Sequence, residues 1–295
     1  MPQFSPLASA KATIAVLQQY GLYTKKSLGQ HFLVADGVVG KILRLADTPP
    51  SMPILEVGPG IGTLTMALLA AGNRVIAVEK DERLRSVLDD IAVDYPDRFS
   101  YLVRDALTLE PADLPSEFVL VANLPYSVAA TIVMDAFERF EAMQSATVML
   151  QREVAARIMA QPASKTYGAY TVKLALMAQV VGSFAVSRSS FLPPPNVDST
   201  VVRLDRVADS ERLSAEQFNQ ARQVIDAAFA ERRKKLRNSL LSNLDADAWV
   251  GEIPMVDLVD RALQVADIDG NRRAEDLSVA EFKALTVAMI GVAFV

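Results

Sequence analysis

Between Pro53 and about Leu204, short apolar runs alternate with segments whose apolar residues recur at helical spacing. This alternation is typical of a parallel β-sheet whose strands are joined by crossover helices. The fold class it predicts is α/β. The expected strands are Ile54–Val57, Arg74–Glu79, Phe99–Val103, Phe118–Ala122, Ala146–Leu150, Val180–Val186 and Thr200–Leu204.

The segments between the first strands have helical character. Thr63–Ala71 is expected to form a helix that ends at Gly72, a natural C-cap. After the second strand, four apolar residues follow the i, i+3, i+4, i+7 spacing of an amphipathic helix, namely Leu84, Val87, Leu88 and Ile91. These helices are the crossovers that a parallel sheet requires.

The character of the chain changes after about Val207. Two capping boxes, Ser214–Gln217 and Ser278–Glu281, each precede an apolar stripe at helical spacing. We therefore predict two domains. The first covers residues 1–207, including an N-terminal arm of residues 1–50, and the second is a helical domain of residues 208–295.

Composition excludes several kinds of site. The chain of 295 residues has no cysteine, which removes disulfides, thiolate metal sites and cysteine nucleophiles. A single histidine, His31, cannot build a multi-histidine metal site, so no metal is expected. The net charge of −5, from 30 basic and 35 acidic residues, excludes a uniformly basic nucleic-acid surface but permits a local basic patch.

The sequence contains no recognisable export or membrane signal. The first 30 residues are interrupted by lysines and lack an apolar core of the signal-peptide kind. The most apolar stretch, Leu285–Val295, is about half the ~20 residues that a membrane-spanning helix needs. We therefore expect a cytoplasmic protein.

The first strand runs into a glycine-rich turn, Gly58-Pro-Gly-Ile-Gly62, and then into a helix. Glycines allow a ligand to approach the backbone closely at this point of an α/β fold. Glu79 ends the second strand, where a carboxylate can accept hydrogen bonds from ribose hydroxyls. Position 63 is threonine, so the dinucleotide pattern G-x-G-x-x-G is incomplete, and S-adenosylmethionine (SAM) is favoured. The alternative is a tight strand–helix connection without a ligand.

Two further strand ends carry polar residues. Asp105 follows the third strand, where it could accept from an adenine amino group or simply cap a loop. The fourth strand ends in Asn123-Leu-Pro-Tyr126. The Asn123 side chain and the Leu124 carbonyl are acceptors for an exocyclic amine, and the Tyr126 ring could stack on a base. Such acceptors favour the pyramidal nitrogen that attacks a methyl group, although an ordinary Asn-x-Pro turn is the alternative.

Positive charge is concentrated in one short run, Arg232-Arg-Lys-Lys-Leu-Arg237. Without its five charges, the 30 basic residues fall to 25, against 35 acidic residues. A localised run of this kind can contact phosphates. It could also be a solvated helix face.

Several longer motifs accompany these residues. They are Lys26–Leu33, Phe191–Val202, Phe229–Leu240 and Arg273–Ser278. Together with the glycine turn and Asn123–Tyr126, they closely resemble the KsgA/RsmA-type small-subunit (16S) ribosomal RNA adenine N6,N6-dimethyltransferases. The resemblance extends from about residue 24 to 285. It implies a class I SAM-dependent methyltransferase fold, Rossmann-like with a mostly parallel seven-stranded sheet, and a small helical C-terminal domain.

The resemblance also implies roles for individual residues. SAM contacts fall on His31, Leu33, Gly58, Glu79, Asp105 and Asn123, and adenine handling falls on Asn123, Leu124, Tyr126 and Phe191. His31 departs from the asparagine of many members, and it could instead be packed and structural. Phe191, which precedes three stiff prolines, could instead be a buried anchor.

The implied reaction is methylation of N6 on two adjacent adenosines in a hairpin loop near the 3′ end of 16S rRNA. A small-subunit precursor is the implied partner, with RNA contacts at Arg232, Arg233, Lys234, Lys235 and Arg237, and we expect a monomer. One alternative is a large-subunit (23S) rRNA dimethyltransferase of the antibiotic-resistance type. The other is an assembly factor without catalytic activity.

Overall fold

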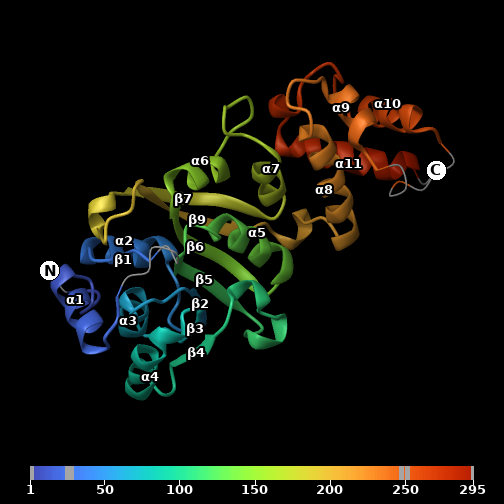
Figure 1. Ribbon diagram of the computed structural model, residues 1–295. Coiled ribbons are helices and arrows are strands. Elements are labelled where there is room, and N and C mark those ends of the chain that lie inside the picture. The colour runs from blue at the N-terminus through green and yellow to red at the C-terminus, as the bar shows by residue number, and fades with distance from the viewer. Residues whose placement is uncertain (1–2, 24–29, 246–248, 250–252, 294–295) are drawn as a thin grey trace. The chain divides into compact units, whose positions relative to one another are not determined.

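The computed structural model describes residues 3–23, 30–245, 249 and 253–293 (Figure 1). Residues 26–29 of the upstream motif and the last two residues of the apolar C-terminal stretch lie outside the described residues. The chain divides into two compact units. The first consists of Met1–Ala155 and Gln179–Arg206, and the second of Ala156–Ala178 and Val207–Val295.

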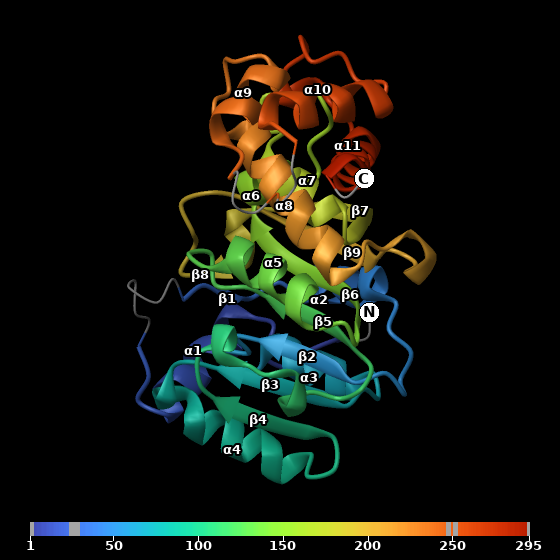
Figure 2. The same cartoon turned by 90° about the vertical axis from the view of Figure 1, so that its right-hand side faces the viewer.

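A seven-stranded sheet forms the centre of the first unit, in the order β4-β3-β2-β5-β6-β9-β7. Figure 2 shows β4, β3, β2, β5 and β6 side by side in this sequence. The seven predicted strands are all present, with ends that differ by up to three residues. Their bounds are β2 (Ile54–Val57), β3 (Val75–Glu79), β4 (Phe99–Val103), β5 (Phe118–Asn123), β6 (Met143–Gln151), β7 (Ala178–Val186) and β9 (Ser199–Arg206).

The order of the strands creates a crevice beside β2. The strand β2 pairs in parallel with both β3 and β5, while β9 runs antiparallel to β6. Along the chain, β3 and β4 follow β2 and lie on one side of it, and β5, which comes next, lies on the other side. In open α/β sheets, ligands bind outside the carboxyl ends of the strands at such a reversal. Gly58, Glu79, Asp105 and Asn123 all lie at these strand ends.

The central strands β2, β3 and β5 are buried on both faces, whereas the edge strands β4 and β7 are partly exposed. One hydrophobic cluster joins alternate strand residues, such as Val119 and Val121, to α2 (Asp36–Ala46), α3 (Thr63–Ala70) and α4 (Arg85–Asp94). The helix α5 (Ala129–Arg139) packs on β6 and buries Val133 and Phe137. The unit also contains α1 (Ala10–Gln19) and the first residues of α6 (Arg152–Ile158).

A second, two-stranded sheet pairs distant parts of the first unit. The strand β1 (Phe32–Leu33) lies antiparallel to β8 (Phe191–Leu192), with Leu33 opposite Phe191. Both Leu33 and Phe191 belong to the main hydrophobic cluster. Strands of two residues show no periodicity, so this sheet could not be predicted from the sequence.

The second unit is helical in the part of the chain that the structure describes. It contains α7 (Ala169–Ala175), α8 (Ala215–Phe229), α9 (Leu236–Asn243), α10 (Met255–Val265) and α11 (Val279–Ala293). Both predicted capping boxes are formed. Ser214 accepts from the Gln217 amide, and Ser278 accepts from the Glu281 amide at 3.2 Å. Short 3₁₀ turns in the two units cover Glu82–Leu84, Ala106–Thr108, Pro111–Asp113, Arg188–Ser190, Asp209–Glu211 and Ala274–Asp276.

The division of the chain differs from the predicted boundary in one respect. Residues 156–178, which the sequence placed in the first domain, belong to the second unit. Tyr167, Val172 and Leu176 are buried in the same cluster as α8 and α11. The Tyr167 hydroxyl also donates to the Leu277 carbonyl at 2.8 Å. The sequence pattern shows that these residues are apolar, but not which core they enter.

No helix among the described residues is both long and apolar enough to cross a membrane.

Candidate functional site

The glycine turn connects β2 to α3 through a backbone that only glycine adopts readily. Gly58, Gly60 and Gly62 have φ values of 72°, 60° and 87°, all in the left-handed region. A Cβ on Gly58 would also meet the Pro125 ring at 3.5 Å, so the turn lies directly against the Asn123–Tyr126 segment. The glycines therefore fix both the course of the turn and its contact with the end of β5.

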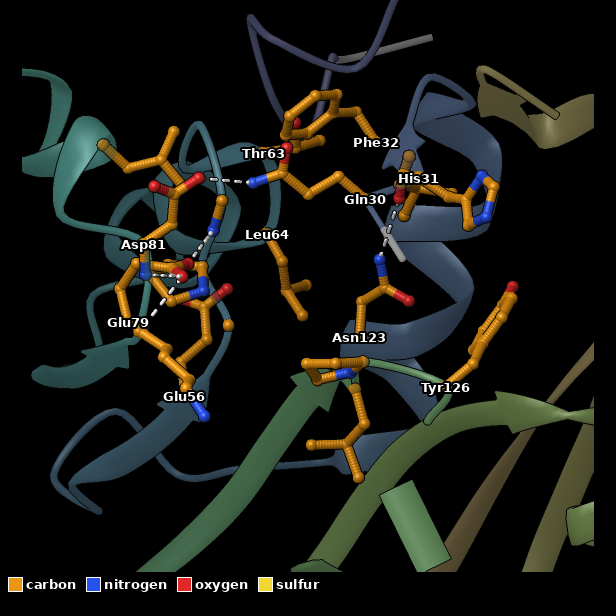
Figure 3. Close-up of a pocket in the computed structure, with 18 of the residues that line it drawn as sticks. Gln30, His31, Phe32, Glu56, Thr63, Leu64, Glu79, Asp81, Asn123 and Tyr126 are labelled. Atoms are coloured by element: carbon orange, nitrogen blue, oxygen red, sulfur yellow. Dashed lines mark hydrogen bonds between the residues drawn. The ribbon is translucent and has the colours of Figure 1, made fainter. Parts of the chain in front are cut away.

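A cavity of about 270 Å³ opens above this turn, within the first unit (Figure 3). Figure 3 shows Glu79 and Asp81 on one side of it and Asn123, His31 and Tyr126 on the other. Most of the predicted site residues meet here. The lining includes His31, Leu33, Gly58, Glu79, Asp105, Asn123, Leu124 and Tyr126, but not Phe191.

Glu79 is held by backbone amides on both of its carboxylate oxygens. Its Oε1 accepts from Lys80 N at 2.8 Å and Asp81 N at 2.9 Å, and its Oε2 accepts from Gly60 N at 3.2 Å. Burial raises the pKa of the Glu79 carboxyl, while these amides act in the opposite direction. A carboxylate oxygen has more than one lone-pair site, so Oε2 can accept a further donor from the cavity.

Two more aspartates flank Glu79. Asp81 accepts from Gln30 Nε2 at 2.8 Å and from Arg83, whose guanidinium lowers the pKa of the Asp81 carboxyl. Asp105 forms an ion pair of 2.7 Å with Lys80, which lowers the pKa of the Asp105 carboxyl. Both carboxylates are therefore ionised at the edge of the cavity near neutral pH.

Glu56 is a cavity residue that sequence reasoning missed. It lies in the middle of β2 with only 1% of its surface exposed. Burial raises the pKa of its carboxyl to about 8, and the nearby Glu79 charge acts in the same direction. A carboxyl inside an otherwise apolar strand, Ile54-Leu-Glu-Val57, was the available signal.

The residues present fit a SAM molecule. The Thr63 hydroxyl is buried at the N-terminus of α3, lines the cavity and has no hydrogen-bond partner among the described residues. Buried polar atoms normally have partners, so an unpaired hydroxyl here matches a ligand acceptor or donor. Glu79, which also lines the cavity, provides an acceptor for hydroxyl groups. The cavity thus offers these polar contacts together with the apolar Leu64.

Asn123 presents its amide oxygen without a donor. Its Nδ2 donates to the His31 carbonyl at 3.5 Å, and no described residue donates to Oδ1. The next residue, Leu124, is buried and is fixed by its own amide, which donates to the Met149 carbonyl at 3.3 Å. No described residue donates to the Leu124 carbonyl. Asn123 and Leu124 therefore leave two oxygen acceptors at the end of β5.

The Tyr126 and His31 rings lie together. They stack with centroids 5.7 Å apart and an interplanar angle of 28°. The Tyr126 hydroxyl bonds with the Ser199 hydroxyl at 2.6 Å, and His31 Nδ1 lies 2.8 Å from the Pro193 carbonyl. The His31 ring is thus anchored to the segment that connects β8 with β9, and the Tyr126 ring to the first residue of β9.

Phe191 is not among the residues that line the cavity, although its motif implied contact with adenine. Its side chain is 3% exposed, and it packs in the main core opposite Leu33. The pairing with Leu33 places Phe191 in the core, where the buried-anchor alternative would have it, and its contact with adenine stays a prediction.

The basic run of the second unit is largely paired with acidic groups of the same unit. Arg232 contacts Glu275 at 3.2 Å, Lys234 contacts Glu231 at 2.7 Å, and Arg237 contacts Asp260 at 2.8 Å. Lys235 donates to Asn271 at 2.8 Å, whereas exposed Arg233 has no partner among the described residues. The net positive potential of the run is therefore smaller than its sequence suggests.

Among the described residues, no group of three or more His, Asp or Glu side chains could hold a metal ion.

Known proteins resemble this chain over most of its length. The family model described as ribosomal RNA adenine dimethylase matches residues 21–278. A protein of Streptomyces griseus named ribosomal RNA small subunit methyltransferase A is 39% identical over 90% of this chain and 89% of its own. Identity to other relatives with that name is 35–38%.

Two solved structures share both the fold and part of the sequence. A dimethyladenosine transferase from Plasmodium falciparum has a TM-score of 0.76 at 25% identity, covering 89% of this chain and 98% of that one. The 23S rRNA methyltransferase ErmE has a TM-score of 0.66 at 26% identity, covering 88% and 99%. The fold is thus that of a class I SAM-dependent methyltransferase. The chain belongs to the ribosomal RNA adenine dimethylase family, whose members are SAM-dependent rRNA adenine dimethyltransferases.

Proposed function

We propose that this enzyme dimethylates N6 of two adjacent adenosines in a hairpin loop near the 3′ end of 16S rRNA, within a small-subunit precursor. The observation that carries the proposal is the pair of open acceptors, Asn123 Oδ1 and the Leu124 carbonyl, beside a cavity that fits SAM. Relatives that are 35–39% identical and named for the small subunit support this choice of substrate.

The cofactor contacts in this proposal are His31, Leu33, Gly58, Glu79, Asp105 and Asn123. Bound SAM supplies an electrophilic methyl group on a sulfonium sulfur. Glu79 accepts the ribose hydroxyls, and Asp105 accepts from the adenine amino group of the cofactor. Thr63 contributes its unpaired hydroxyl at the helix N-terminus, where the helix dipole favours a carboxylate. No metal takes part.

The target adenine is held by Asn123, Leu124 and Tyr126. The two acceptors take the N–H groups of the exocyclic amine, and they bind it more strongly as its nitrogen becomes pyramidal. Tyr126 offers its ring for stacking, and the hydrogen bond to Ser199 keeps that ring in place. Phe191 contributes indirectly, since it anchors the segment that holds the Tyr126 and His31 rings.

The helical unit binds RNA in this proposal. Arg233 and Lys235 are exposed and form no direct ion pair with any described residue, so they are the principal phosphate contacts of the run. The paired residues of the run also contribute, once RNA phosphates replace the carboxylates that now contact Arg232, Lys234 and Arg237. The enzyme acts as a cytoplasmic monomer.

A large-subunit target is the second candidate, because ErmE covers 88% of this chain with a TM-score of 0.66. The third candidate is an assembly factor without catalytic activity, and the open acceptors argue against it. The test is methyl transfer from labelled SAM onto undermethylated small subunits and, in parallel, onto large subunits. Mass spectrometry then identifies the modified nucleosides. Dimethyladenosine in 23S rRNA alone would favour the second candidate, and SAM binding without transfer would favour the third.

A further inference from the structure

Two exposed arginines of the first unit, Arg152 and Arg188, are joined to the residues that hold the Tyr126 ring. The Arg152 amide donates to the Asp198 carbonyl at 3.0 Å, and the Arg188 amide donates to Asp198 Oδ1, also at 3.0 Å. Asp198 immediately precedes Ser199, whose hydroxyl bonds with that of Tyr126 at 2.6 Å. Both arginines are therefore linked through Asp198 to the ring that is proposed to stack on the target base.

The topology places this pair of arginines at the edge of the sheet where the site lies. The strands β5 and β6 run parallel, and Asn123 at the end of β5 lies opposite Met149. Beyond Met149, β6 continues for two residues, which span about 7 Å, before Arg152 begins α6. The strand β9 begins beside the end of β6, because Gln151 pairs with Ser199. Both arginines thus lie beyond the level of Asn123, at the carboxyl edge of β5 and β6.

The exposure of these residues increases from the base site to the surface. Ser199 is fully buried, Asp198 is half-buried, and both arginines are exposed. Among the described residues, neither guanidinium has an ion-pair or hydrogen-bond partner, and the Asp198 carboxylate accepts from a backbone amide instead. The basic run of the second unit differs, because carboxylates already pair with Arg232, Lys234 and Arg237. The two arginines therefore offer unpaired positive charge beside the proposed base site.

This charge suits the backbone of the RNA that carries the target base. A nucleotide held by its base at Tyr126 has its phosphates on the far side of the ribose, towards solvent. An adenine drawn out of an RNA loop has one such phosphate on its 5′ side and one on its 3′ side. The planar guanidinium of arginine binds phosphate oxygens through two parallel N–H donors. Two arginines attached to the same residue match two neighbouring phosphates in number and in charge.

We propose that Arg152 and Arg188 form a phosphate clamp, which binds the RNA phosphates beside the target adenosine and so positions its base on Tyr126. This inference rests on the proposed function and adds positioning residues in the first unit to the RNA contacts of the helical unit. Neither arginine is among the residues that line the cavity, so the clamp acts on the RNA and not on the cofactor.

The test measures binding of undermethylated small subunits and, in parallel, of large subunits at several salt concentrations. S-adenosylhomocysteine is kept saturating, so that no methyl transfer occurs. The variants are Arg152→Gln, Arg188→Gln and the double variant. Arg74→Gln is the matched control, because the Arg74 side chain is also exposed and unpaired among the described residues but precedes β3, at the opposite edge of the sheet. Calorimetric binding of S-adenosylhomocysteine reports whether each variant is folded with an intact cofactor site.

Each single variant should weaken binding of the subunit that the parent binds by about threefold to tenfold at low salt, because the contacts are exposed to solvent. The slope of log affinity against log salt concentration should become shallower by about 1 for each arginine. Arg74→Gln should bind as the parent does. Combining Arg152→Lys with Arg188→Lys should keep the slope but lose part of the affinity, because an ammonium lacks the paired donors of a guanidinium. Losses no larger than that of Arg74→Gln, or an unchanged slope in the double variant, would overturn the proposal.

A second arm of the experiment locates the contact on the RNA. Small subunits are reconstituted with neutral methylphosphonates in place of the phosphates on either side of the target adenosines. The parent should bind these subunits more weakly than unmodified ones, whereas the double variant should bind both equally. If the modification weakens binding of the double variant as much as it weakens binding of the parent, the arginines contact RNA elsewhere and the clamp is refuted.

The proposed function can fail independently. Methyl transfer to large subunits alone would overturn the choice of substrate, while the salt comparison on large subunits would still decide the role of Arg152 and Arg188. Conversely, efficient transfer to small subunits with an unaltered salt slope in the double variant leaves the function in place and removes only the clamp.

Discussion

The Thr65 hydroxyl donates a hydrogen bond of 2.6 Å to the buried carboxyl of Glu56. This polar contact joins β2 to α3, and Glu56 lines the cavity. Because burial dominates, the pKa of Glu56 rises from 4.5 to about 8, and the folded protein keeps this carboxyl protonated where an unfolded chain would ionise it.

Glu56→Gln should therefore change the pH dependence of stability. A carboxyl whose pKa is raised by folding stabilises the protein below its unfolded value of 4.5, and this contribution is lost as pH rises to about 8. The variant should thus gain stability relative to the parent across this window. Urea unfolding followed by circular dichroism at pH 5 and pH 9 measures the difference. An equal difference at both values would show that Glu56 ionises normally.

Glu79→Ala should weaken SAM binding by about tenfold to a hundredfold, because a hydrogen bond to a charged acceptor is worth roughly 1.5–3 kcal/mol. Glu79→Gln is the matched control, since it retains one oxygen acceptor near Gly60. Isothermal titration calorimetry on the folded variants gives the affinities. Unchanged affinity in Glu79→Ala would contradict the assignment of the ribose acceptor.

Asn123→Ala should fold but lose about a hundredfold to a thousandfold in methyl transfer at saturating SAM and RNA. The lost acceptor acts mainly in the transition state, so the deficit should appear in single-turnover rates. Tyr126→Ala is the comparison. It removes a stacking surface, so a larger share of its deficit should lie in substrate affinity than for Asn123→Ala. A near-normal rate for Asn123→Ala would mean that Asn123 is only a turn residue.

Phe191 should behave as a core residue. Its side chain is 3% exposed, so Phe191→Ala should cost about 3–5 kcal/mol of unfolding free energy, and Phe191→Leu much less. Methyl transfer by folded Phe191→Leu should stay close to that of the parent. If Phe191→Leu retains its stability but loses transfer, Phe191 handles the base directly, as its motif implies.

Neutralising Arg232, Arg233, Lys234 and Lys235 together should weaken binding to small subunits and flatten its salt dependence, while SAM binding remains unchanged. Arg232 and Lys234 are already paired with carboxylates. The double variant Arg233→Gln, Lys235→Gln should therefore account for most of the loss in binding. Arg237→Gln is the comparison, and it should weaken binding less because Asp260 already pairs with its guanidinium. If the slope of log affinity against log salt concentration is unaltered in the quadruple variant, the run is a solvated face.

The strands and most cavity residues could be predicted because their signals are local. An apolar run marks a buried strand, and a polar residue directly after it marks the edge of the sheet where Gly58, Glu79 and Asn123 meet. Glu56 gives a different signal, a carboxyl inside an apolar strand, because it lines the cavity from within the strand and not from its end. The position of Phe191 depends on its pairing with Leu33, far away in the chain, which no local pattern encodes.

The helical unit is not a continuous stretch of the gene, because residues 156–178 supply part of its core. A recombination event that exchanged only the segment after Arg206 would pair Tyr167 and Val172 with foreign helices. Such a chimaera would inherit a mismatched interior unless both segments moved together. We therefore expect the two segments to be inherited jointly, so that this unit diversifies through point substitutions rather than by exchange at a single junction.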